Sequence, residues 1–196
     1  MDDSRLPTPE TARGVLGGDD GFARALERWA ADAVVDEAAR QRARQRWLRT
    51  QAEEEASFVG TLLDLAERGR SVTLEVGAHR VRGRIVGIGG DFVALRSERD
   101  QHVLLRTGVV EVVRAEPGAP AVTGDRTTVL EVGLAGVLGP LAAERPDVLV
   151  RTTSGAAVRG ELRSAGVDVV HLRLPGDPPT PAWLPIDALA VVVLDP

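Results

Sequence analysis

The sequence predicts a mainly β protein with some helix, in which two tandem small β-barrels, each a helix followed by five strands, stand behind an N-terminal helical arm. Three observations predict this fold. Residues 22–51 are rich in helix formers and contain neither Pro nor Gly. Beyond Gly69 the apolar residues alternate with polar ones, as in a strand. Residues 60–72 align without a gap on residues 136–148, which indicates an internal repeat.

The N-terminal region is predicted to contain a tail and a helical arm. Residues 1–19 mix Pro and Gly with charged residues and predict a mobile tail. Residues 20–56 form the arm, whose helix over 22–51 carries a weak apolar stripe at every fourth position from Val35 to Trp47.

The two repeats define the remaining domains. A short apolar helix is expected over 58–68, and Val72, Leu74 and Val76 then mark the first strand. We assign residues 57–116 to the first barrel, 117–128 to a linker with Pro and Gly, and 129–196 to the second barrel.

The repeats share residues that set strand geometry. Val81-Arg82-Gly83 matches Val158-Arg159-Gly160, and Asp91 matches Asp168. Glycines within strands predict a sharp bend or a close backbone approach. Residues 90–91 and 167–168 lie between apolar runs, where tight hairpin turns are expected.

Composition narrows the class of protein. The chain has 24 basic and 29 acidic residues and a net charge of -5, so a globally basic surface for nucleic acid is excluded. All basic residues are Arg, and Lys, Asn, Tyr and Cys are absent, which we interpret as the codon bias of a high-GC bacterial genome. Without Cys there are no disulfides or thiolate metal sites. No signal peptide or membrane-spanning run is recognised, so a cytoplasmic protein is expected.

Catalytic and metal-binding patterns are not apparent. His79, His102 and His171 lack the spacing of metal ligands on one element, and no Ser-His-Asp or paired-carboxylate arrangement is visible. The glycine-rich segment 87–91 lacks the Lys and Ser/Thr of a phosphate-binding loop. We therefore expect a binding protein that is not an enzyme and has no cofactor or metal.

An arginine-rich stretch of the helical arm is the strongest chemical feature. Its members flank Trp47, and guanidinium groups pair well with phosphates. Two other interpretations stay open: a solvated helix face neutralised by neighbouring carboxylates, or a docking face for a protein partner through the 22–51 helix. The arginines of this stretch are Arg40, Arg42, Arg44, Arg46 and Arg49.

A second basic group lies on a predicted strand. Arg82 and Arg84 alternate with Val81, Gly83 and Ile85, which places the two arginines on the outer face of that strand. They form either a basic stripe for an RNA backbone or an ordinary polar sheet face. Aromatic residues for base stacking are scarce, and Trp183 beside Pro185 is expected to cap the second barrel.

The first repeat resembles the Sm-like (LSm, Hfq-like) family of small β-barrels. The resemblance is carried by the segments 81–85, 91–95 and 106–113, which look like the bent second strand, the third strand, and the last turn and strand of that family. It implies oligomers formed through edge strands and RNA bound on strand-connecting loops. Phe92 matches an RNA-contacting aromatic position, and Arg106 a basic one. The second repeat has Ile186-Asp187 in place of Arg106-Thr107 and so resembles a structural copy.

Two functions follow as hypotheses. The first is RNA binding through the first barrel and the arginine-rich helix, and the alternative is a structural adaptor that binds protein and no nucleic acid. In either case, edge pairing between the two repeats predicts a monomer or small homo-oligomer rather than a large ring.

Overall fold

The computed structural model describes residues 19–124 and 130–195. The chain divides into two compact units, residues 1–51 and 52–196. The predicted tail lies outside the described residues apart from Asp19, as does the end of the predicted linker, residues 125–128.

One long helix, α1 (Asp19–Glu54), occupies the described part of the first unit. The helix predicted over 22–51 is confirmed and extends by three residues at each end. No Pro lies within it, and Ala52, Glu53 and Glu54 are good helix formers that continue its last turn. Every residue from Gln41 to Gln51 is exposed.

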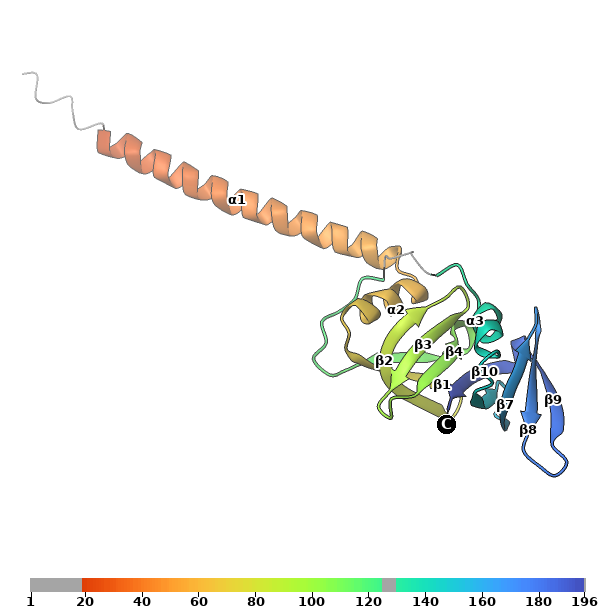
Figure 1. Cartoon of the computed structure of the whole chain (residues 1–196). Coiled ribbons are helices and arrows are strands. Elements are labelled where there is room, and N and C mark those ends of the chain that lie inside the picture. Colours follow the sequence, from red (N-terminus) through yellow and green to blue (C-terminus); the bar gives the residue numbers. More distant parts are fainter. Residues whose placement is uncertain (1–18, 125–129, 196) are drawn as a thin grey trace, which may run out of the picture. The chain divides into compact units, whose positions relative to one another are not determined.

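In its described residues, the second unit (Figure 1) contains two short helices, two 3-10 turns and ten strands. The helix predicted over 58–68 is confirmed, and Ser57 caps it by accepting a hydrogen bond from the N–H of Gly60 at 2.9 Å. The elements up to residue 115 are α2 (Phe58–Glu67), β1 (Ser71–Val76), β2 (His79–Ile88), β3 (Phe92–Ser97), β4 (His102–Arg106), η3 (Thr107–Val109) and β5 (Val112–Ala115). Those that follow are α3 (Leu134–Leu141), β6 (Asp147–Thr152), β7 (Ala157–Ala165), β8 (Val169–Leu174), β9 (Thr180–Pro185), η4 (Ile186–Ala188) and β10 (Leu189–Leu194).

All ten strands belong to one antiparallel sheet in the order β5-β1-β2-β3-β4-β10-β6-β7-β8-β9. A mainly β fold is therefore confirmed, but the prediction of two tandem barrels is wrong, because the sheet is continuous and open. We refer to β1–β5 as the first half and to β6–β10 as the second. Within each half the strands follow the same order, and the halves join where β4 pairs with β10. An unpaired strand edge is unfavourable, and here each half covers an edge of the other instead of closing on itself.

The two halves bury opposite faces of the central strands. On β4, Val103 and Leu105 point into one core, together with Leu74, whereas Leu104 points into a second core with Leu172. Successive side chains of a strand point to opposite faces of the sheet. One continuous sheet can therefore contribute to both cores only if the buried face changes from one side of the sheet to the other at the β4–β10 junction. Beyond that junction, the face that carries the first core becomes the solvent face of the second half.

Each half contains a glycine at a close approach of two strands. A Cβ on Gly83 would lie 2.9 Å from the carbonyl carbon of Arg96 and closer still to its oxygen, and one on Gly160 would lie 2.7 Å from the Arg173 oxygen. The predicted close approach is confirmed at both positions. The hairpin turns predicted at 90–91 and 167–168 also connect β2 to β3 and β7 to β8.

Two buried or half-buried carboxylates hold the connection between the halves. Asp64 on α2 accepts hydrogen bonds from the backbone N–H groups of Thr123 at 3.0 Å and Gly124 at 2.8 Å. Asp91 accepts one from Leu134, the first residue of α3, at 2.7 Å. A carboxylate at a helix N-terminus satisfies an amide that the helix leaves unpaired, so the turn after β2 positions the helix of the other half.

Candidate functional site

A hollow of about 580 Å³ lies beside the junction of the two halves, and we call it the junction hollow. Its lining residues come from β2, β3, the β3–β4 turn, β4, β6, β7 and β10. Five of its lining residues are arginines and one is a carboxylate, Glu98. The arginines are Arg80, Arg82, Arg99, Arg151 and Arg159.

The floor of the junction hollow is apolar and follows one row of paired residues across the sheet. Val103 on β4 lies opposite Val193 on β10. Leu149 on β6 lies opposite Val193 on one side and Arg159 on the other. The row therefore begins in the core of the first half and continues onto the solvent face of the second half. Because of this change, an arginine of the solvent face, Arg159, lies next to apolar residues of the row.

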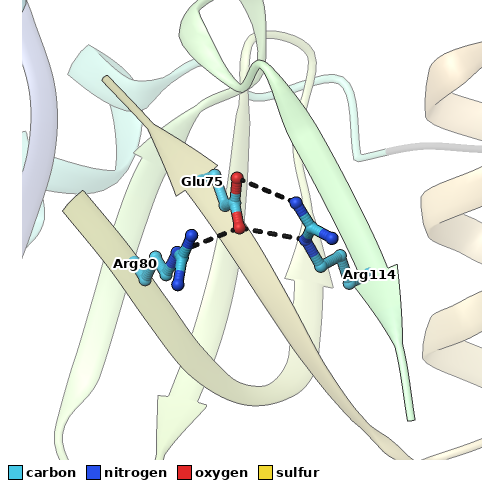
Figure 2. Close-up of polar contacts among 3 residues, drawn as sticks. All are labelled: Glu75, Arg80 and Arg114. Carbon is cyan, nitrogen blue, oxygen red and sulfur yellow. Dashed lines mark hydrogen bonds and ion pairs between the residues drawn. The ribbon is translucent and has the colours of Figure 1, made fainter. Parts of the chain in front are cut away.

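The two arginines from β2 are already ion-paired. Arg80 Nε lies 3.0 Å from Glu75 Oε1, and the same oxygen receives Arg114 Nε at 3.0 Å (Figure 2). The hydrogen bond from Arg114 lowers the pKa of Glu75 below its usual value, and Arg80 lowers it further. Arg82 pairs with Glu98 at 3.0 Å. The carboxylates of Glu75 and Glu98 therefore balance part of the positive charge of the junction hollow.

Two other arginines of the junction hollow have no carboxylate partner among the described residues. Arg99 is exposed in the β3–β4 turn, which is held by the ion pair of Arg96 with Asp100. The Nη1 atom of Arg151 lies 3.4 Å from His79 Nε2. Their guanidinium donors remain available to an anion in the hollow.

The predicted strand arginines lie on the outer face, as the alternation indicates. Arg82 and Arg84 are both exposed. Arg82 lines the junction hollow, whereas Arg84 lines a neighbouring hollow of about 450 Å³ with Arg96 and Asp100. The two arginines are thus near each other on β2 but face different hollows.

Phe92 and Arg106 are engaged in the fold. Phe92 is 3% exposed and packs in the core of the second half, so it offers no ring face for stacking. Arg106 Nη1 donates to the backbone oxygen of Asp187 at 2.9 Å and pairs with its carboxylate at 3.1 Å. This residue therefore ties the end of β4 to η4.

The arginine-rich stretch lies on α1, in the first unit, whereas the junction hollow lies in the second. All five side chains are exposed. Arg40 lies 3.4 Å from Glu37, and Arg42 Nε donates to the carbonyl of Ala38 at 3.0 Å. The ion pair agrees with partial neutralisation of this face, one of the interpretations left open above. The stretch comprises Arg40, Arg42, Arg44, Arg46 and Arg49.

Sequence reasoning missed the contributions of Arg99, Arg151 and Arg159. The repeat contained a signal for one of them, because Arg159 is the equivalent of Arg82 and both line the junction hollow. The expectation for Trp183 was also wrong. Its side chain is 63% exposed and stacks on His171, with ring centroids 5.1 Å apart and planes at 10°.

The described part of the chain contains no group of three or more acidic or histidine side chains placed to hold a metal ion. None of its helices combines the length and the apolar character needed to cross a membrane.

Comparison with known proteins gives no family. No protein-family model matches the sequence, and no curated protein matches it significantly. The Sm-like resemblance therefore stays a hypothesis that rests on the segments 81–85, 91–95 and 106–113.

Proposed function

We propose that this chain is a non-catalytic RNA-binding protein that holds the phosphate backbone of its ligand in the junction hollow. The supporting observation is the convergence of five arginines in one hollow, two of which, Arg99 and Arg151, lack a carboxylate partner among the described residues. The planar fork of a guanidinium group matches the geometry of a phosphate.

The charge distribution supports a local anion site on an acidic protein. The whole chain carries a net charge of -5, yet the lining of the junction hollow has five arginines against one glutamate. Contacts of this kind release counterions, so affinity falls as salt rises, with a slope in log-log form of about -0.7 per phosphate for single strands.

The proposal includes the assembly and the location of the protein. Because the β4–β10 pairing occurs within one chain, an edge of each half is already covered. The protein then acts as a monomer or small homo-oligomer in the cytoplasm.

The test is fluorescence anisotropy with a random RNA pool at 50 and 200 mM salt. For the double variant Arg99→Glu with Arg151→Glu, we expect at least a tenfold loss of affinity and a salt slope shallower by about 1.4, the contribution of two phosphate contacts. Arg70→Glu is the matched control, because Arg70 is exposed and lies outside the junction hollow. A protein that binds no RNA at 50 mM salt would rule out the proposal.

The same assay measures the contribution of α1. The double variant Arg42→Glu with Arg46→Glu reverses two charges of the arginine-rich stretch and leaves the junction hollow intact. A loss equal to that of the hollow variant would assign half of the contact to α1. No loss would restrict RNA to the second unit.

A second candidate function is that of a structural adaptor docking through α1. It is favoured by two adjacent apolar side chains on this helix, Trp47 and Leu48, which are 63% and 48% exposed. This function predicts no RNA affinity at low salt and a protein partner whose capture is lost in Trp47→Ala with Leu48→Ala.

A further inference from the structure

The solvent face of the second half carries a stacked aromatic pair in register with its arginines. On β9, Trp183 lies opposite His171 of β8, and Arg173 lies on the same face two residues along β8. On β7 this face continues with Glu161, opposite Arg173, and with Arg159. The buried residues of these strands, such as Leu172 and Leu162, point to the other face and form the core.

Trp183 is held in place while leaving a ring face to solvent. Its 63% exposure coexists with a nearly parallel stack on the His171 ring, with planes at 10°. Pro181 and Pro185 flank it on β9, and the fixed φ of proline limits the backbone freedom of this edge strand. A ligand that stacks on the indole therefore meets a ring that is already ordered.

The edge of β9 is poorly suited to adding another strand. The N–H of Ile186 donates to the carbonyl of Asp168 on the β8 side. Antiparallel ladders alternate, so Leu184 and Ala182 also point their N–H groups toward β8, and the outward positions are 181, 183 and 185. Two of these three are prolines without an N–H. Only Trp183 among them offers an outward backbone N–H, so this edge favours a partner that engages side chains such as the indole.

The arginines connect this aromatic pair to the junction hollow. Arg159 lines both the junction hollow and a second hollow of about 450 Å³, which Arg173 also lines. Glu161 lies between them on the same face but is paired with Arg163 at 2.6 Å. A polyanion leaving the junction hollow can thus follow Arg159 and Arg173 toward His171.

We propose that the Trp183–His171 stack is a base-stacking platform for RNA whose backbone is held by the junction hollow. This inference rests on the proposed function and adds to it the part of the ligand that is recognised, the exposed face of a base. Aromatic platforms beside a basic groove bind single strands with little sequence preference, because every base has a face that can stack.

The test compares a ligand with bases and one without. Labelled oligoadenylate and inorganic polyphosphate of similar length are each titrated into the wild type, Trp183→Ala, Trp183→Phe and the control Phe58→Ala. Phe58 is an aromatic residue that is 39% exposed and lines neither hollow. For Trp183→Ala we expect a loss of oligoadenylate affinity of roughly 5- to 150-fold, the range found for removing one stacking ring. Polyphosphate affinity should stay within about twofold of the wild type. Trp183→Phe should recover most of the loss, and Phe58→Ala should change neither affinity.

A fluorescence measurement gives an independent readout. The chain has three tryptophans, so replacing Trp29 and Trp47 by Phe leaves Trp183 as the sole indole. Oligoadenylate should quench its emission, and polyphosphate should not. If Trp183→Ala binds oligoadenylate as tightly as the wild type, or loses both ligands equally, the platform is refuted and the proposed function stands. If the wild type binds neither ligand, both fail.

Discussion

Replacing the close-approach glycines, Gly83 and Gly160, tests how closely the paired strands of each half approach each other. An alanine at position 83 would place its Cβ 2.9 Å from the carbonyl carbon of Arg96 and closer to its oxygen. Both neighbours are backbone atoms of β3, so the conflict is relieved only by separating β2 from β3 by several tenths of an ångström. Overpacking of this kind costs about 1–3 kcal/mol, and we expect Gly83→Ala at the upper end, about 2–3 kcal/mol.

The repeat supplies a graded comparison. At Gly160 the Cβ would lie 2.7 Å from the Arg173 oxygen, and part of the remaining contact is with a flexible leucine side chain. The expected cost of Gly160→Ala is therefore smaller, about 1–2 kcal/mol. At Gly108 nothing lies within 4 Å of a built Cβ. There the change should be within about 0.5 kcal/mol of the wild type.

Urea denaturation followed by circular dichroism measures the three variants. With a slope of about 2 kcal/mol per molar urea, Gly83→Ala should lower the midpoint by about 1 M. Gly160→Ala should lower it by roughly half as much, and Gly108→Ala hardly at all. Equal midpoints for Gly83→Ala and Gly108→Ala would show that β2 and β3 do not approach each other as described.

Three further changes probe the connection, the Glu75 ion pairs and the edge strand. Asp64→Ala leaves two loop amides without their acceptor, so we expect urea denaturation to show a free energy of unfolding lower by about 2–3 kcal/mol. Little change would show that the connection between the halves is loosely held. Glu75 has a lowered pKa in the folded state, so its contribution to stability is present above its unfolded pKa and is lost as the pH falls through the folded value. In Glu75→Gln, the melting temperature should therefore decrease less than in the wild type as the pH falls below about 4.5. The same dependence of melting temperature on pH in both proteins would contradict the role of the arginine partners of Glu75. Replacing Pro181 and Pro185 by Thr restores outward N–H groups to β9, and light scattering should then show association that grows with concentration; a double variant as dispersed as the wild type would count against the blocked edge.

The sequence by itself determined the elements and their order. The absence of Pro and Gly from residues 22–51 predicts α1, and the alternation of apolar and polar residues from Val72 onward predicts β1. Both patterns are local, so they can be recognised in the sequence alone. Matching residues such as Gly83 and Gly160 also predict the repeated close approach, since only glycine tolerates a neighbouring carbonyl at that distance.

Only the tertiary structure decided how the strands close and which residues meet. The sequence pattern of β4 predicts a strand with a neighbouring strand on each side. The same pattern is compatible with a neighbour from its own half and with β10. The pairing with β10 makes the sheet continuous and reverses its buried face. That reversal gathers Arg99, Arg151 and Arg159 from distant segments, buries Phe92 in the core of the other half, and leaves Trp183 on a solvent face. These outcomes depend on contacts between residues far apart in the chain, which local periodicity does not encode.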